Sequence, residues 1–262
     1  MSYLLYLLDA AALGFTVVAA MRRARGASAT PTPQELVATA ATTTPSVEAL
    51  FLDCDDCLYQ NNWATAKKIT ASIASYTVKL GVDKDKAYSL YKTHGTCLKG
   101  MLVEGFIDDA GVEEFLHAVH DIEYSDIAPD PKLRAVLAKV KTPQWIFTAS
   151  TREHARRCME RLGVHDLPWR GIIDTRSCKL ETKHSRSSFE AAMRMANVTD
   201  PKACVFCDDS VKNIVAAKAV GWRTVLVGLY DRDTGAPLVC EAADHQIASL
   251  HSLPSVVPEC FS

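Results

Sequence analysis

The chain has no excess of basic residues. Its 262 residues include 29 Lys and Arg against 31 Asp and Glu, which gives a formal net charge of -2 at pH 7. Nucleic-acid backbones attract proteins through clustered positive charge, so this balance argues against a nucleic-acid partner. The sequence also lacks internal repeats of about 20–50 residues and long low-complexity tracts, which excludes solenoid, fibrous and fully disordered classes. With 48% hydrophobic residues, the length predicts one large domain or one domain that carries an insert.

A secreted disulfide framework is absent as well. The nine cysteines are an odd number spread thinly along the chain, whereas disulfide scaffolds are short and dense in cysteine. We therefore expect the reducing interior of a cell. Two pairs have the CxxC spacing of zinc ligands, Cys54 with Cys57 and Cys204 with Cys207. Each pair lies in or beside an apolar run, so we favour ordinary buried cysteines and keep a four-thiolate zinc site as the alternative.

The N-terminal region is apolar at first and ends in a polar segment with almost no charge. Residues 3–21 form an apolar run that only Asp9 interrupts, and arginines follow it within residues 22–25. The run fits a membrane anchor or an organellar presequence, and otherwise an extension of a cytoplasmic protein without structural consequence. Residues 26–46 are rich in Ala, Thr, Ser and Pro, which is typical of a flexible linker. We assign residues 1–46 to this targeting or anchor segment plus linker and expect membrane contact through residues 3–21.

From Val47 onward, apolar runs of strand length alternate with segments of helical period. The expected strands are Val47–Asp53, Gln144–Ala149, Gly171–Asp174, Cys204–Cys207, Arg223–Val227 and His245–Ala248, and the expected helices between them are Arg152–Leu162, Ser185–Ala196 and Val211–Val220. This alternation predicts an α/β fold, a parallel sheet with helices on both faces. Residues 62–140 are helical throughout. We therefore predict a core domain of residues 47–61 and 141–262 and an inserted all-helical cap of residues 62–140.

Polar side chains follow three of the expected strands at the point where each strand ends. These side chains are Asp53, Asp55 and Asp56 after the first strand, Thr148, Ser150 and Thr151 after the second, and Asp208, Asp209 and Ser210 after a later one. The carboxyl ends of parallel strands meet at one edge of a sheet, where ligands bind. Several carboxylates at one edge repel one another unless a cation lies among them, and oxygen ligands suit Mg²⁺. The sequence therefore predicts a magnesium site.

The same segments resemble the four motifs of haloacid dehalogenase (HAD) superfamily phosphatases, in the required order. These motifs are LFLDCDDCLY, WIFTAS, Lys183 and CVFCDDSVKN. The forms LYKTHGTCLKGM, APDPKL, KxxxxxF and DDSVKNI are similar to the pyrimidine 5'-nucleotidase-like branch found in fungi and plants. The resemblance covers about residues 47–253. It implies a Rossmann-like core with a C1-type helical cap.

The resemblance assigns a role to each motif residue, and the chemistry of the side chains agrees with it. Asp53 would attack phosphorus to give an aspartyl-phosphate, and Asp55 would protonate the leaving oxygen and later activate water. The Thr148 hydroxyl, backbone amides near Ala149 and the Lys183 ammonium would neutralise the phosphoryl oxygens, with Lys179 as the alternative lysine. The expected metal ligands are Asp53, the Asp55 carbonyl, Asp208 and, directly or through water, Asp209.

Substrate choice is expected to come from the cap. The resemblance implies that His94 and Lys99 meet the nucleoside and that Tyr59 lies near the entrance, whereas simple packing is the alternative for the tyrosine. The sequence thus predicts a magnesium-dependent phosphomonoesterase for nucleoside 5'-monophosphates, pyrimidine ones above all. A phosphatase for another small phosphate ester and a catalytically silent binding protein of the same fold are the alternatives.

Overall fold

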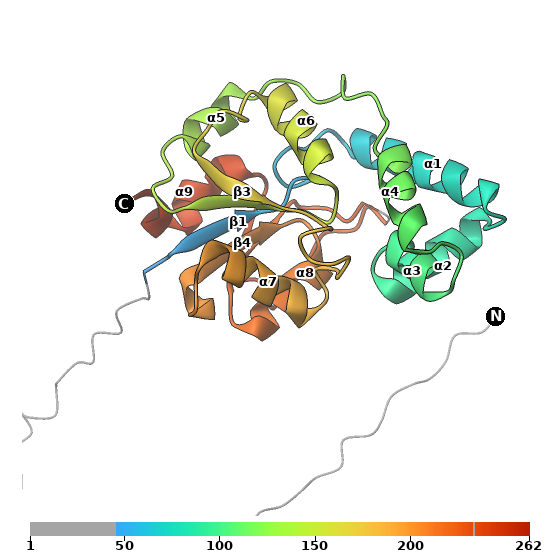
Figure 1. Ribbon diagram of the computed structural model, residues 1–262. Helices are drawn as coiled ribbons and strands as arrows, with labels where there is room; N and C mark the ends of the chain where they lie inside the picture. The colour runs from blue at the N-terminus through green and yellow to red at the C-terminus, as the bar shows by residue number, and fades with distance from the viewer. Residues whose placement is uncertain (1–45, 233) are drawn as a thin grey trace, which may run out of the picture. The chain divides into compact units, whose positions relative to one another are not determined.

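A computed structural model describes residues 46–232 and 234–262 (Figure 1). Within them the chain forms a six-stranded sheet in the order β3-β2-β1-β4-β5-β6, and every neighbouring pair is parallel. The strands are β1 (Ala49–Leu52), β2 (Gln144–Phe147), β3 (Trp169–Ile173), β4 (Cys204–Asp208), β5 (Arg223–Val227) and β6 (His245–Ile247). Each lies within two residues of its predicted bounds. The α/β prediction is confirmed.

Every residue of the central strand β1 is buried, which is why its sequence is a continuous apolar run and not an alternating one. Because successive side chains point to opposite faces of a sheet, β1 contributes to two separate cores. Leu50 and Leu52 pack in the cluster on one face. Ala49 and Phe51 pack in the cluster on the other, where the Phe51 ring stacks on Trp222 with a centroid distance of 4.6 Å.

Helices cover both faces of the sheet, as Figure 1 shows: α5, α6 and α9 lie on one side and α7 and α8 on the other. Their bounds are α5 (Pro131–Leu137), α6 (Arg152–Leu162), α7 (Arg186–Ala196), α8 (Val211–Val220) and α9 (Leu253–Val256), with short 3₁₀ turns at Pro201–Ala203, Leu250–Ser252 and Pro258–Phe261. Buried side chains of the helices complete the two cores. This layering is the one that parallel strands with crossover helices require.

Local signals fix where α6 begins and ends. The Thr151 side chain accepts a hydrogen bond from the backbone N–H of His154 (3.2 Å), which caps the first turn. Gly163 ends the helix in the left-handed region (φ 74°), where glycine has no steric penalty. The cap places the third residue of α6, His154, directly beyond the carboxyl end of β2.

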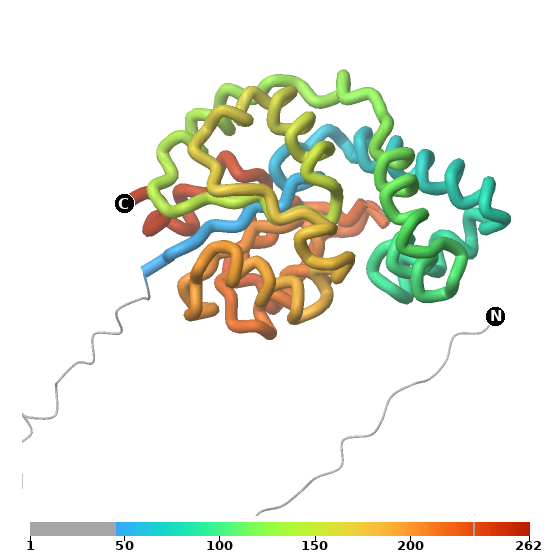
Figure 2. The backbone as a smooth tube through the Cα atoms, in the orientation of Figure 1, coloured from blue at the N-terminus to red at the C-terminus, as the bar shows by residue number. Residues whose placement is uncertain are grey.

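The insert between β1 and β2 contains α1 (Ala64–Lys79), α2 (Lys84–His94), α3 (Cys97–Val103) and α4 (Asp109–Val119). These helices share an apolar core of their own, and Figure 2 traces them as a compact arm of the backbone. Residues 124–140 were expected in the cap, but they pack elsewhere. Leu133 and Leu137 of α5 are buried in the cluster on the sheet. By packing, the helical cap runs from α1 to α4, and α5 belongs with the sheet.

The N-terminal targeting or anchor segment, with the membrane contact expected of residues 3–21, lies outside the described residues. Among the residues that the structure describes, none of the helices combines the length and apolar character needed to cross a membrane.

Candidate active site

The buried ammonium of Lys183 joins the ends of three neighbouring strands. Its Nζ donates to Oδ1 of Asp53 (2.5 Å) after β1, to the carbonyl oxygen of Phe147 (3.2 Å) at the end of β2, and to Oδ2 of Asp208 (2.6 Å) at the end of β4. Burial by itself would lower the pKa of Lys183, but the charges of Asp208 and Asp53 raise it well above its ordinary value. Lys183 is therefore a fixed positive charge at the centre of the site. Lys179 is exposed.

Three carboxylates crowd around this charge. Asp53, Asp208 and Asp209 each offer an oxygen atom, and these atoms lie within 4.8 Å of one another. Burial and the charges of Asp208 and Asp55 raise the pKa of Asp53, and burial with the charges of Asp208 and Asp53 raises that of Asp209. One lysine does not compensate three carboxylates. A divalent cation with a preference for oxygen ligands fits this set, and Mg²⁺ is such a cation.

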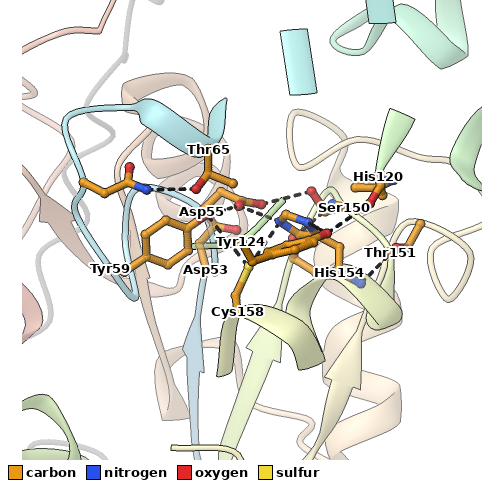
Figure 3. Close-up of polar contacts among 12 residues, drawn as sticks. Asp53, Asp55, Tyr59, Thr65, His120, Tyr124, Ser150, Thr151, His154 and Cys158 are labelled. Carbon is orange, nitrogen blue, oxygen red and sulfur yellow. Dashed lines mark hydrogen bonds and ion pairs between the residues drawn. The ribbon is translucent and has the colours of Figure 1, made fainter. Parts of the chain in front are cut away.

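Asp55 takes no part in that cluster through its side chain, which is turned toward α6 (Figure 3). Its Oδ1 accepts from the Tyr59 hydroxyl (2.6 Å) and faces Nε2 of His154 (2.7 Å), and its Oδ2 accepts from the Ser150 hydroxyl (3.0 Å). Burial alone would raise the pKa of Asp55, but the His154 charge and these three hydrogen bonds hold it well below its usual range. The carboxylate is thus ionised and held by three donors.

Thr148 lies beside these groups at the end of β2. It is buried, its backbone N–H donates to the carbonyl of Ile173 (2.9 Å), and its Oγ1 accepts from the N–H of Ser150 (3.0 Å). Ala149, between them, is exposed. Asp208 is positioned from its own loop, because its Oδ1 accepts from the N–H of Ser210 (2.8 Å) and from Nδ2 of Asn213 (2.9 Å). The structure thus brings the residues of the four motifs to one edge of the sheet.

Comparison with known proteins agrees with this geometry. The sequence pattern of the haloacid dehalogenase-like hydrolases matches residues 47–221. The chain belongs to this family. The chain is also 28% identical over 204 residues to "Phosphate metabolism protein 8" of Saccharomyces cerevisiae. The match covers 70% of this chain and 62% of the yeast protein, which is less than two thirds of the yeast protein's length.

Solved structures share the fold of this HAD-like hydrolase. A HAD phosphatase from Thermococcus onnurineus superposes with a TM-score of 0.52 at 18% identity, over 82% of this chain and 100% of that one. CbbY from Rhodobacter sphaeroides, solved in complex with phosphate, gives a TM-score of 0.57 at 17% identity, over 79% and 96% of the two chains.

The cap residues singled out in the sequence make ion pairs. Nζ of Lys99 in α3 contacts Oε2 of Glu181 on the core side (2.7 Å), and Nε2 of His94 in α2 lies 3.5 Å from Oε1 of Glu104 within the cap. Tyr59 does not lie at the entrance, where it was expected. It is buried, and its hydroxyl holds Asp55. The substrate roles of His94 and Lys99 stay predictions.

The cysteines of the HAD-like hydrolase are free thiols, eight of them buried and Cys240 partly exposed. In the described part of the chain, the groups whose donor atoms could share a metal ion are the Asp53 cluster and a set of Cys54, Asp55 and Cys158. The four CxxC cysteines therefore do not assemble into one thiolate site there, and the alternative of a four-thiolate zinc module is wrong.

The sequence analysis named Ser150 and Tyr59 without their contact to Asp55 and missed His154 altogether. His154 and Ser150 lie 99 and 95 residues further along the chain. One signal was available, because both residues follow the predicted second strand at the edge where ligands bind. Nothing in the spacing of the first motif points to His154.

Proposed function

We propose that the protein is a magnesium-dependent phosphomonoesterase that hydrolyses nucleoside 5'-monophosphates, with pyrimidine nucleotides as its preferred substrates. The observation that carries the proposal is the arrangement at the end of β1, where Lys183 bridges Asp53 and Asp208. A carboxylate, a fixed cation and a set of metal-binding oxygens are the parts that phosphoryl transfer to an aspartate needs.

In the first half of the reaction, a carboxylate oxygen of Asp53 attacks phosphorus as the ester P–O bond breaks. The electron pair of that bond stays on the departing oxygen, which takes a proton from Asp55. Asp55 is ionised before substrate binds, and the negative charge of a phosphate ester beside it favours uptake of that proton from solvent. Lys183, Thr148 and the backbone amides near Ala149 stabilise the charge on the phosphoryl oxygens. A magnesium ion bound by Asp53, Asp208, Asp209 and the Asp55 carbonyl would supply further positive charge.

In the second half, water attacks the aspartyl-phosphate. Asp55 takes one proton from the water as its oxygen bonds to phosphorus, and the Asp53 carboxylate leaves. Inorganic phosphate forms, and Asp53 returns to its starting state. Asp55 then releases to solvent the proton that it took from the water. The three donors keep Asp55 ionised, which is the state in which it can accept that proton.

The substrate class is supported by the cap. The segment LYKTHGTCLKGM, which resembles the pyrimidine 5'-nucleotidase-like branch, forms the end of α2 and most of α3. It faces the loop that carries Lys183, since a Cβ built on Gly95 would lie 2.9 Å from Nδ1 of His184 and 3.0 Å from the Thr182 side chain. Residues of this segment are thus close enough to the phosphate site to contact the nucleoside. The related yeast protein carries a name from phosphate metabolism.

The test is phosphate release by the full chain from a panel of nucleoside, deoxynucleoside and sugar monophosphates, with magnesium and with a chelator. We expect release that needs magnesium and that is fastest with UMP or CMP. The variant Asp53→Asn should lose turnover by at least about 10³-fold because it removes the nucleophile. Asp56→Asn is the matched control: Asn tolerates the left-handed backbone of this neighbouring residue (φ 57°), so the control should keep its activity.

Each departure from these expected results overturns a different part of the proposed function. Undiminished release by Asp53→Asn removes Asp53 as the nucleophile. Release that is fastest with a sugar phosphate replaces the nucleotide by another small ester. No release from any ester by the folded protein leaves a binding protein of the same fold.

A further inference from the structure

The imidazole of His154 is wholly buried, yet it contacts a carboxylate of the site that is partly exposed to solvent. Nε2 lies 2.7 Å from Oδ1 of Asp55, and the side-chain exposures are 0% for His154 and 23% for Asp55. An ion pair with a buried partner adds little net stability, because the cost of removing the charges from water offsets their attraction. Stability of the core therefore does not explain this contact. It ties α6 to the loop after β1, as Figure 3 shows.

The other ring nitrogen of His154 is anchored as well. The Tyr124 hydroxyl donates its single hydrogen to the carbonyl oxygen of His120 (3.1 Å), so its oxygen is left to accept from Nδ1–H of His154 (2.9 Å). Nε2 faces an ionised carboxylate and therefore also donates. Because the imidazole ring donates from both nitrogens, it cannot rotate without the loss of a hydrogen bond in a buried space.

The donors around Asp55 are not shared equally between its two oxygens. An ionised carboxylate oxygen has about two good acceptor directions. Tyr59 and His154 occupy both directions of Oδ1, whereas Ser150 occupies one direction of Oδ2. Oδ2 is thus the oxygen that keeps room for the proton of a substrate or a water.

We propose that His154, anchored by Tyr124, is a positioning residue that fixes the rotamer of Asp55 so that Oδ2 faces the reacting oxygen. The proposal rests on the proposed function, in which Asp55 is the acid and base. His154 contacts Asp55 and does not need to touch the substrate. Without it, the Asp55 carboxylate rotates about two single bonds, and fewer of its orientations are productive.

The test separates positioning from a general structural effect by the leaving group of the ester. The value of kcat/KM reports steps up to the departure of the leaving group. Nitrophenolate leaves without a proton, whereas the 5'-alkoxide of UMP needs one from Asp55. We expect His154→Ala to lower kcat/KM by about 10²-fold with UMP and by less than tenfold with p-nitrophenyl phosphate. Asp55→Ala should show the same selectivity, and the double variant should lose little more than Asp55→Ala alone.

Further variants keep the test valid if His154→Ala folds poorly. Tyr124→Phe removes only the hydroxyl that anchors Nδ1, and a smaller loss with the same ester selectivity is expected. His154→Gln keeps a donor that can reach Asp55 and should recover part of the activity with UMP. The matched control is His120→Asn, a change to the neighbouring buried histidine, whose ring centroid is 5.0 Å from that of His154; it should leave both esters unaffected.

Equal losses with the two esters, or none in either His154→Ala or Tyr124→Phe, overturn the positioning role and leave the proposed function intact. Additive losses in the double variant overturn it too. A wild-type protein that hydrolyses neither ester removes the proposed function, and the positioning role with it.

Discussion

Replacement of Lys183 by methionine tests the electrostatic centre of the site without any knowledge of the substrate. Its ammonium lies 2.5 Å from Asp53 and 2.6 Å from Asp208, and the side chain is 4% exposed. At an effective dielectric constant of about 20, each contact contributes about 6 kcal/mol of attraction. Desolvation of the lysine offsets much of that, and uptake of a proton by one carboxylate offsets more. Loss of one partner from such a buried pair costs about 3–5 kcal/mol.

For a domain of this size, a change of 1 kcal/mol shifts Tm by about 2–4 °C, so we expect Lys183→Met to lower Tm by about 10 °C in the presence of a chelator. Saturating magnesium should recover part of the loss, because the cation replaces a positive charge among Asp53, Asp208 and Asp209. The assay is thermal unfolding with and without magnesium. Lys179→Met is the control: its side chain is exposed and its Tm should stay within about 1–2 °C of the wild type.

If Lys183→Met unfolds at the wild-type temperature in the chelator, or if magnesium stabilises the variant no more than the wild type, Lys183 is not the charge that compensates these carboxylates. The same pair of variants decides between the two lysines in catalysis. Lys183→Met should lose phosphate release by about 10²-fold or more, and Lys179→Met should keep it.

Two further predictions concern stability. Burial lowers the pKa of His120 to about 4, so this residue adds stability above its unfolded pKa of about 6.5 and loses it as the pH falls toward 4. Between pH 6.5 and 4, the free energy of unfolding measured with urea should fall by about 2–3 kcal/mol less in His120→Asn than in the wild type. The same pH dependence in both proteins would contradict this role of His120. Gly100→Ala places a Cβ 2.7 Å from that of Leu90 and should destabilise the cap by about 1–3 kcal/mol. The loss is measured by calorimetry against Gly81→Ala. A Cβ at the exposed Gly81 meets no atom within 4 Å, so that variant reports only the strain of its positive φ of 76°.

The strands could be predicted from the sequence because burial on both faces leaves a plain signal. Leu50 and Phe206 come from runs in which almost every residue is apolar, and each run lies in the interior of the sheet. The end of the cap could not be predicted in the same way. The apolar spacing of α5 is that of any amphipathic helix, and it does not say which core Leu133 and Leu137 will join.

The proposed site residues also differ in how readily the sequence reveals them. Asp53 and Asp208 are found from the sequence because each lies at the carboxyl end of a strand, and parallel strands bring these ends together. Lys183 does not directly follow a strand, since β3 ends at Ile173. Its place depends on a loop in which Lys179 and Leu180 adopt positive φ values of 53° and 62°, a backbone shape that the residue types there do not announce.

That loop also contacts the cap. Glu181 pairs with Lys99 of α3 (2.7 Å), and Leu180 packs against the apolar core of the cap. Arg176, at the start of the loop, holds both carboxylate oxygens of Glu113 in α4 (2.8 and 2.7 Å). A loop tied on one side to the cap and on the other to the Asp53 and Asp208 carboxylates cannot move independently of either. The position of the cap and the position of Lys183 are therefore coupled, and for this reason the site can be understood only from contacts between segments far apart in the sequence.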